Sequence, residues 1–491
     1  MKPGCEILSV AEMTAADAAA VAAGTPGAVL MDRAGGAVAT AITDRWSPRR
    51  VLVLCGPGNN GGDGYVVARR LAQAGWAVRT ASLADRGRLS GDAALASQDW
   101  DGPDGPLAVA SLDAADLVVD ALFGAGLARP LDGPAAAVLR AAEASGLPIV
   151  AVDLPSGLPG DGAGPLGYAP ACALTVTFHR KKPAHVLEPG RSLCSEVAVA
   201  DIGLQPQAGH KLFENLPALW LDAFPWPRTD AHKYARGSVA VVSGHMTHTG
   251  AARLAARAAL RIGAGLVTLL SPPDAVLVNA AHLEAVMLKP FANAGELADA
   301  VSRATAAVIG PAAGVSAATR ANLLALALTG ARLVVDADAI TVFRDEPDAL
   351  FAALGPGDVL TPHLGEFERL FPGLLAASPE RITAARAASA RAGAVVLLKG
   401  SDTVIAAPDG RAAVTTNGSP YLATAGSGDV LAGFISGLLA QGMESFEAAC
   451  AGVWIHAEAG RGFGPGLIAE DLPGLAPAVL RELRGTTAVS A

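Results

Sequence analysis

The sequence predicts an α/β protein of two domains, each built on a parallel sheet covered by helices. Its 491 residues exceed what one hydrophobic core usually organises, so the length alone indicates two or three domains. Hydrophobic residues make up 51% of the chain but aromatic residues only 4%, so small aliphatic side chains carry the apolar content. Such residues suit helices packed tightly over a parallel sheet. Short β-rich runs alternate with helical patterns, which is typical of βαβ units.

The first domain is expected over residues 1–215. A helical stretch at 13–42 precedes its sheet. Strands are then predicted at 51–55, 76–83, 116–123, 148–154 and 174–179, with helices at 63–75 and 134–146. Pro217, Pro225 and Pro227 interrupt the alternation, which places the boundary near residue 215.

The second domain is expected over residues 225–491, where the alternation restarts. Strands are predicted at 238–244, 266–271, 306–310, 332–338, 358–362, 394–400 and 403–408. Helices are predicted at 249–265 and 318–330, and a long helix is predicted to begin near Gly428. Neither domain is a short-period repeat of the other.

Charge and cysteine content exclude several classes of function. The net charge of −9 does not favour nucleic acid or an anionic membrane as a partner. The five cysteines form no C-x-x-C pair, which favours reduced thiols in a cytoplasmic protein without a zinc site. No signal-peptide pattern and no apolar run long enough to span a bilayer is found in the sequence.

A glycine-rich loop follows the first predicted strand, in CGPGNNGGDGYVVARR at 55–70. Gly56, Gly58 and Gly61 match G-x-G-x-x-G, a pattern whose backbone amides can cradle phosphate at a helix N-terminus. It is not a Walker A loop, because no Gly-Lys-Ser/Thr follows. The alternative is a plain strand-to-helix turn in which Asp63 only caps the helix.

Carboxylates recur where later strands of the first domain end. Asp120 and Asp153 both follow apolar strands, and ligands of parallel sheets bind outside the carboxyl ends of strands. We therefore expect both carboxylates to face one crevice with the 56–63 loop and a second glycine-rich loop at 123–130. The oxygens of Asn60, Asp120 and Ser156 are of the kind that hard cations prefer, although each could simply serve a cap or a loop hydrogen bond.

These motifs, in this order, resemble the NAD(P)H-hydrate epimerase domain. The resemblance covers about 10–205 and rests on GPGNNGGDGYVVARRLAQAG, VDALFGAGL and VDLPSG, and on LMDRAG at 30–35, where Asp32 replaces the commoner glutamate. It implies a Rossmann-like three-layer α/β fold and a bound potassium ion held by Asn60, Asp120 and Ser156. It also implies a substrate site formed by Asn59, Asn60, Gly61, Gly62, Asp63, Gly124, Ala125, Gly126, Leu127, Ala128, Arg129, Pro130 and Asp153.

The resemblance suggests that the loop holds both a pyrophosphate, on backbone amides, and a cation, on side-chain oxygens. Epimerisation at C6 of the hydrated ring needs proton transfer at a hemiaminal carbon, for which we predict Asp153 as the acid/base. The alternative is that Asp153 only orients the ribose or the ring. The basic stretch at 179–191 could lie near the substrate phosphates, but a solvated turn is the favoured interpretation.

The second domain carries three motifs. Gly426, Ser427, Gly428 and Asp429 open the long predicted helix, where free amides can hold a phosphoryl group and Asp429 can accept a proton; the alternative is an N-cap aspartate. Lys399 and Gly400 end a strand and suit a nucleotide phosphate, unless Lys399 is an exposed hairpin residue. His363, in the segment at 359–370, could touch substrate or be a satisfied loop residue.

Together these segments resemble the ADP/ATP-dependent NAD(P)H-hydrate dehydratase, which has a ribokinase-like fold, over about 228–480. The resemblance implies nucleotide contacts from Lys399, Gly400, Ser401, Asp402, Thr403 and Gly428, and hydrate contacts from Ala251, Gly314, His363 and Asp429. One departure stands out, because Ala312 and Ala313 occupy positions where the family has a glycine and then a larger residue. If that backbone needs a positive φ, alanine costs stability or reshapes the site.

The two resemblances together imply metabolite repair. The first domain would interconvert the epimers of NADHX and NADPHX, and the second would phosphorylate the C6 hydroxyl of one epimer and eliminate phosphate. ADP is the expected co-substrate, giving AMP, with ATP possible and Mg²⁺ present, and a homo-oligomer is expected. One alternative is a small-molecule kinase whose N-terminal domain regulates it. Another is a non-catalytic protein in which that domain only binds nucleotides or scaffolds partners.

Overall fold

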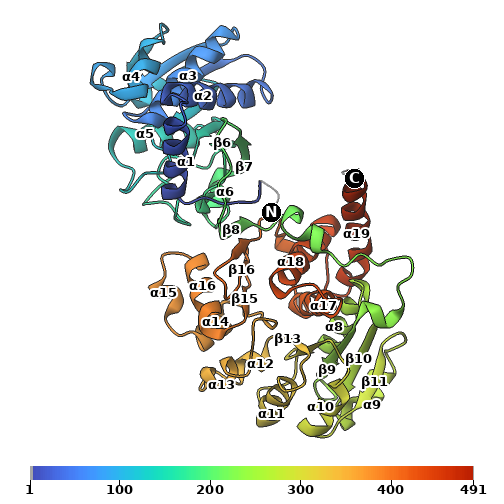
Figure 1. The fold of residues 1–491 in the computed structure, drawn as a ribbon. Helices are drawn as coiled ribbons and strands as arrows, with labels where there is room; N and C mark the ends of the chain where they lie inside the picture. The colour runs from blue at the N-terminus through green and yellow to red at the C-terminus, as the bar shows by residue number, and fades with distance from the viewer. Residues whose placement is uncertain (1–3, 490–491) are drawn as a thin grey trace. The chain divides into compact units, whose positions relative to one another are not determined.

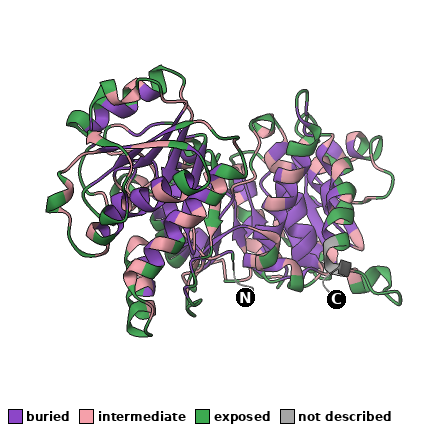
Figure 2. Cartoon of the chain, turned by 90° about the horizontal axis from the view of Figure 1, so that it is seen from above, coloured by how far each residue is buried: buried purple, intermediate pink, exposed green. Residues whose placement is uncertain are grey.

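The computed structural model describes residues 4–489, of which the last few, 486–489, are described by their backbone alone. The chain forms two compact units (Figure 1). The first is Glu6–His210, and the second runs onward from Lys211 and also contains Cys5. In both units the purple, buried residues concentrate in the strands and in the helix faces against them (Figure 2). Among the described residues, no helix combines the length and the apolar character that crossing a membrane requires.

The first unit contains a seven-stranded sheet in which every neighbouring pair is parallel. In spatial order the strands are β3 (Asp104–Pro106), β2 (Ala77–Ser82), β1 (Arg50–Cys55), β4 (Leu117–Ala121), β5 (Ile149–Val152), β6 (Leu174–Phe178) and β7 (Glu196–Ala200). The chain moves outward from β1 to one edge and then returns to continue from β4 to the other edge. The strand order therefore reverses between β1 and β4, where open α/β sheets form a ligand crevice.

Helices cover both faces of this sheet. They are α1 (Val10–Ala22), α2 (Gly27–Thr43), α3 (Asn59–Gln73), α4 (Gly91–Gln98), α5 (Gly133–Ala144) and the short α6 (Gly190–Cys194). Side chains of β1 alternate between the faces: Val51 and Val53 pack in the core with α1, α2 and α3, whereas Leu52 and Leu54 pack with α5. The predicted helical stretch at 13–42 is two helices with a break before Gly27. The predicted helix at 63–75 begins earlier, at Asn59.

The second unit contains a ten-stranded mixed sheet. In spatial order its strands are β11 (Met287–Pro290), β10 (Leu266–Ser271), β9 (Ser238–Val242), β12 (Ala306–Ile309), β13 (Arg332–Val335), β14 (Val359–Leu360), β15 (Val395–Leu398), β16 (Val404–Ala406), β17 (Ala412–Val414) and β8 (Leu212–Glu214). The strands from β11 to β15 are parallel, and β16 runs antiparallel to both its neighbours. Strand β8, just before the expected boundary at residue 215, pairs with β17.

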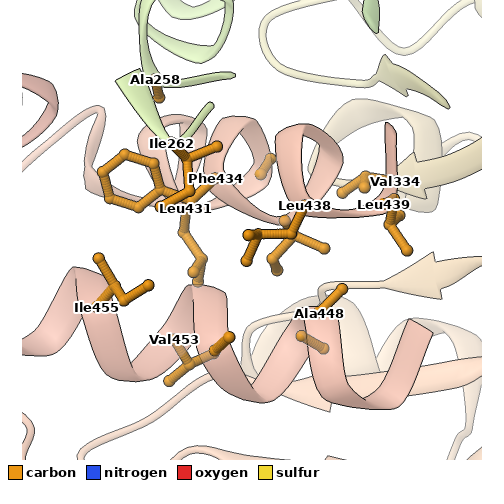
Figure 3. Close-up of a cluster of buried hydrophobic side chains, with 14 of the residues drawn as sticks. Ala258, Ile262, Val334, Leu431, Phe434, Leu438, Leu439, Ala448, Val453 and Ile455 are labelled. Carbon is orange, nitrogen blue, oxygen red and sulfur yellow. The ribbon is translucent and has the colours of Figure 1, made fainter. Parts of the chain in front are cut away.

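Thirteen helices of the described chain belong to this unit. They are α7 (Pro217–Trp220), α8 (Gly250–Arg261), α9 (Val276–Ala280), α10 (Ala294–Val301), α11 (Ala317–Leu326), α12 (Asp338–Thr341), α13 (Pro347–Phe351), α14 (Leu364–Leu370), α15 (Leu374–Ala377), α16 (Arg381–Ala392), α17 (Ser427–Ala440), α18 (Ser445–Phe463) and α19 (Leu472–Val489). Leu431, Phe434 and Leu438 of α17 lie between α8 and α18 (Figure 3). Because α17 is buried almost along its whole length, its N-terminus is rigidly placed.

Candidate functional sites

The first unit has a cavity of about 950 Å³ at the carboxyl ends of its central strands. Helices α1 and α2 and the loops after β1, β4 and β5 supply most of its wall. Asp92 of α4, Phe178 at the end of β6, Lys182 after it, and Ile202 after β7 complete it. The predicted site residues that line it are Asn59, Asn60, Asp63, Gly124, Ala125, Gly126, Leu127, Ala128, Arg129 and Asp153. The structure thus brings both predicted glycine-rich loops and the predicted catalytic aspartate to one cavity.

Three predicted substrate residues, Gly61, Gly62 and Pro130, are not among those lining the cavity. Gly61 has a structural function, because a Cβ there would lie 2.0 Å from the carbonyl oxygen of Gly56. The loop can therefore fold back on itself only with glycine at this position.

The carboxylate of Asp153 accepts three hydrogen bonds. One carboxylate oxygen, Oδ1, accepts hydrogen bonds from Lys182 Nζ at 2.7 Å and from Thr177 Oγ1 at 2.9 Å, and Oδ2 accepts one from the amide of Ala125 at 3.1 Å. Its backbone has a φ of +66°, a left-handed conformation that is uncommon for residues other than glycine, although aspartate adopts it more readily than most. Burial opposes ionisation, but the charge of Lys182 and the hydrogen bonds from Lys182 and the Ala125 amide outweigh it and lower the pKa of Asp153 to about 2.

The favoured interpretation of the basic stretch at 179–191, a solvated turn, is wrong. Lys182 is 2% exposed, and the nearby His179 and His185 are also buried. Arg180 pairs with Glu6 at 2.9 Å. These side chains turn inward to reach partners such as Glu6 and Asp153. Because those partners are distant in sequence, the run of charged residues does not by itself indicate them.

Asp63 does not cap its helix, contrary to the plain-turn alternative. It is the fifth residue of α3, whose N-cap position is Gly58, and its side chain lines the cavity. Burial raises the pKa of Asp63 well above its ordinary value, and the negative charges of Asp153 and Asp17 add to the effect. Asp17, on α1, lines the same cavity and was not predicted from the sequence; burial raises its pKa as well.

In the second unit, α17 begins at a glycine with a φ of +87°. This residue, Gly426, occupies the N-cap position and has no side chain with which to cap the helix. The amides of Ser427, Gly428 and Asp429 begin the helix without a side-chain cap, which is the arrangement at which helix N-termini can receive an anion. Asp429 is the third helical residue, so the alternative that it is an N-cap is wrong. Burial and the nearby charge of Asp336 raise the pKa of Asp429 to about 6.

Lys399 approaches this N-terminus from the end of β15. Its ammonium donates to Asp336 Oδ1 at 2.8 Å, and the hydroxyl of Thr361 donates to the same oxygen at 2.8 Å. A Cβ built on Gly428 would lie 3.6 Å from Lys399 Nζ, which places the lysine beside the start of α17. With 22% of its side chain exposed, Lys399 is not the exposed hairpin residue of the alternative interpretation.

The other predicted nucleotide residues lie in the turn after β15. Gly400 and Ser401 are exposed, and Thr403 closes the turn by donating from Oγ1 to the carbonyl of Gly400 at 2.8 Å. Asp402 instead points inward: its carboxylate, 1% exposed, pairs with Arg381. Arg381 also donates to the carbonyl of Lys399 at 3.0 Å, so it fixes the turn from behind.

The predicted hydrate residues come from two loops, which carry Gly314 and His363, and from the first turns of two helices, which carry Ala251 and Asp429. His363 caps α14, because its Nδ1 accepts from the amides of Gly365 at 2.9 Å and Glu366 at 3.2 Å, while its side chain stays half-exposed. The amide of Gly314 donates to Asp338 Oδ2 at 2.8 Å. Ala251 lies in the first turn of α8, which follows β9. All follow the carboxyl ends of parallel strands, on the side of the sheet where ligands bind.

Comparison with known proteins decides the family. Residues 27–184 match the family model described as YjeF-related protein N-terminus, and residues 239–467 match the one described as NAD(P)H-hydrate dehydratase. A bifunctional NAD(P)H-hydrate repair enzyme Nnr from Moorella thermoacetica is 38% identical, covering 93% of this chain and 93% of its own. Its namesake from Gloeobacter violaceus is 37% identical, with 93% of each chain covered.

The chain belongs to the family of bifunctional NAD(P)H-hydrate repair enzymes. Both resemblances found in the sequence are thereby confirmed, in the same order along the chain. A solved structure titled ADP/ATP-dependent NAD(P)H-hydrate dehydratase from Bacillus subtilis, co-crystallised with ATP/Mg²⁺, is 24% identical, with a TM-score of 0.46 over 53% of this chain and 95% of that one.

Two of the predicted potassium ligands, Asp120 and Ser156, hydrogen-bond each other. Asp120 is fully buried; it accepts from Ser156 Oγ at 2.7 Å and from the Ser156 amide at 2.8 Å. Burial raises the pKa of Asp120 to about 6, so a cation beside it would favour its ionised form. Asn60 lines the adjacent cavity, and its Nδ2 is buried without a hydrogen-bond partner among the described residues. Carboxylate, hydroxyl and amide oxygens suit a hard monovalent cation.

One buried residue of the repair enzyme's second unit was missed from the sequence. His456, on α18, contacts the carbonyl oxygen of Ser427 at 3.0 Å and its Oγ at 3.2 Å. Burial lowers the pKa of His456 to about 4, so it is a neutral support behind the α17 N-terminus. The sequence offered no signal, because a single histidine in an apolar helix is usually a core residue.

One of the two alanines that depart from the family pattern, Ala312, lies on backbone with a positive φ. Ala312 has a φ of +52°, whereas Ala313 does not have a positive φ. We expect Ala312→Gly to raise the free energy of unfolding of this unit by about 1 kcal/mol, because glycine adopts this conformation without the Cβ clash. Urea unfolding, followed through dehydratase activity, would measure it. Ala313→Gly is the matched control and should lower stability by about 0.5–1 kcal/mol; a gain there would contradict the explanation.

Proposed function

We propose that the first unit interconverts the R and S epimers of NADHX and NADPHX in its cavity, and that the second unit dehydrates the S epimer at the expense of ADP. The observation that carries the proposal is the pairing of two different sites in one chain. One is a large cavity with an ionised aspartate, and the other is an uncapped helix N-terminus with an aspartate beside it. The first suits proton transfer on a small ring, and the second suits phosphoryl transfer.

In the first unit we assign Asp153 as the base. With its pKa near 2 it is ionised at neutral pH, so it can accept the proton of the C6 hydroxyl. Asp63, in the same cavity, is driven toward its protonated form and can return a proton. Opposite protonation states of two carboxyl groups are what a reversible epimerisation requires. The amides of the 59–63 and 124–130 loops are assigned to the nucleotide phosphates.

We assign the potassium ion to Asn60, Asp120 and Ser156, whose oxygens fit it. When bound, the ion supplies a fixed positive charge beside the cavity. Asp120 and Ser156 would hold the β4 and β5 loops together around that charge, because they already hydrogen-bond each other. Activity in potassium buffer compared with tetramethylammonium buffer tests this assignment; equal epimerase rates would overturn it.

In the second unit we assign Asp429 as the base and the α17 amides as the phosphoryl site. Asp429 accepts the proton of the C6 hydroxyl, and the hydroxyl oxygen attacks the β-phosphorus of ADP. The bond to the bridging oxygen breaks and AMP leaves. Phosphate then departs from C6 while C5 loses a proton, which restores the dihydronicotinamide. Lys399 stands beside Gly428, at the start of α17, and can neutralise the charge that develops there. Mg²⁺ is the expected ion, and ATP is the alternative phosphoryl donor.

The test is a mixture of both NADHX epimers with and without ADP in potassium buffer. We expect full recovery of the dihydronicotinamide absorbance only when ADP is present, with one AMP formed for each NADH. Chromatography of the nucleotides separates this outcome from a kinase, which would consume ATP to ADP and accumulate a phosphorylated acceptor. No recovery with either nucleotide would overturn the proposed function.

A further inference from the structure

Lys182 is the least expected feature of the cavity wall. It follows β6 and is 2% exposed, yet it is among the residues that line the cavity. Its ammonium donates to Asp153 Oδ1 at 2.7 Å and to Thr177 Oγ1 at 2.8 Å. Because the Thr177 hydroxyl itself donates to the same carboxylate oxygen, the three groups form a closed triangle. A lysine enclosed in this way is held in one rotamer and fixes its partners in turn.

The same segment also holds the backbone of Asp153. His185 Nδ1 lies 2.9 Å from the amide of Lys182 and must accept its proton. The ring proton is therefore on Nε2, which donates to the carbonyl oxygen of Asp153 at 2.8 Å. The left-handed backbone of Asp153, with its φ of +66°, is thus held by a hydrogen bond from the segment that carries Lys182. Side chain and backbone of the aspartate are fixed by residues only three positions apart.

We propose that Lys182 is a positioning residue of the epimerase site, which fixes the carboxylate of Asp153 through its ammonium and through Thr177. The inference rests on the proposed role of Asp153 as the base. It adds a residue that the sequence motifs did not assign, from a stretch that the sequence favoured as a solvated turn. Lys182 acts through Asp153 and needs no contact with the substrate.

Removing the ammonium should change the protonation of Asp153. The titratable groups that face Asp153 come from several elements: Asp17 on α1, Asp63 on α3, Lys182 and His185 after β6, and Cys194 on α6. Without Lys182, burial and the carboxyl groups of Asp17 and Asp63 both favour a proton on Asp153. The pKa of Asp153 should rise, so the base should be lost as the pH falls.

The experiment follows epimerisation alone in the full chain. Purified (R)-NADHX is added without ADP, and the appearance of the S epimer is followed by chromatography from about pH 5 to about pH 8. The variants are Lys182→Met, Lys182→Arg and Thr177→Val, with Lys181→Met as the matched control from the same basic stretch. ADP-dependent dehydration of the S epimer by each variant shows that the chain is folded in its other unit.

We expect the epimerisation rate of the wild type to stay constant down to about pH 5. The rate of Lys182→Met should be at least about tenfold lower at about pH 5 than at about pH 8. Lys182→Arg should restore the flat profile, and Thr177→Val should shift it in the same direction by less. If Lys182→Met does not fold, Thr177→Val carries the test. A profile parallel to wild type in the folded variants, or the same shift in Lys181→Met, would overturn the proposal.

Failure of this inference is distinguishable from failure of the proposed function. Asp153→Asn serves as the reference variant. If it epimerises normally, Asp153 is not the base and the proposed function of the first unit fails. If it is inactive while Lys182→Met keeps the wild-type pH profile, only the role of Lys182 fails.

Discussion

Replacing Asp429 with Asn should abolish ADP-dependent dehydration while leaving epimerisation at its wild-type rate. The carboxylate lies in the first turn of α17, beside the amides that would receive the transferring phosphoryl group. Asn keeps the shape but cannot take up a proton, so we expect the dehydration rate to fall by at least about 100-fold. The rate is measured from the dihydronicotinamide absorbance with pure (S)-NADHX, and epimerisation is measured without ADP.

The pKa of Asp429 also fixes the pH dependence of the dehydratase. A base must be ionised to accept a proton, and burial and Asp336 raise the pKa of this group to about 6. The wild-type dehydration rate should therefore fall as the pH drops through about 6 and stay level above it. Asp345→Asn, an exposed aspartate of the same unit, is the control and should change neither rate nor profile. Equal loss of both activities in Asp429→Asn would contradict separate sites.

Replacing Asp153 with Asn should stop epimerisation and leave the dehydratase intact. With ADP present and both epimers supplied, recovery of NADH should stall at the amount of the S epimer. We expect a loss of about 100-fold or more in epimerase rate, because the carboxylate that accepts the proton is gone. The amide oxygen can still accept a hydrogen bond from Lys182 but cannot neutralise its buried charge, so the melting temperature of the first unit should fall.

The double variant Asp153→Asn, Lys182→Met separates these two effects. Removing both charges should recover much of the stability, because no unpaired buried charge remains, but none of the epimerase activity. Asp99→Asn, at the exposed end of α4, is the surface control. Full recovery of NADH by Asp153→Asn would show that another group supplies the base.

The features that could be predicted from the sequence are those that depend on residues close together in the chain. The α/β alternation, the uncapped start of α17 and the two glycine-rich loops of the first unit all follow from residues adjacent in sequence. Short strands such as β8 and β17 were not predicted, because three residues give no periodicity to detect. They are strands only because a partner lies beside them.

The same limit explains the missed site residues. Lys182 and Asp17 belong to the cavity because the sheet brings distant segments together, and nothing in their neighbours indicates it. Asp402 shows a related limit: its motif predicts a nucleotide contact, and only the structure shows that its carboxylate faces inward, where Arg381 from α16 binds it. The proposed strain at Ala312 could be stated from the sequence only as a condition, and the backbone angle then supplied the answer.

Cys5 precedes the first unit in sequence but belongs to the second unit. It is buried in the core of the second unit, and its carbonyl oxygen accepts from the amide of Glu214 at 2.7 Å. The chain thus leaves that unit and returns to it at neighbouring points, and the ends of the first unit are also close, with His210 Nδ1 3.4 Å from Glu12 Oε1. The epimerase half is an insertion within the dehydratase half. A single cut after residue 210 would therefore separate Cys5 from the core of the dehydratase unit to which it belongs.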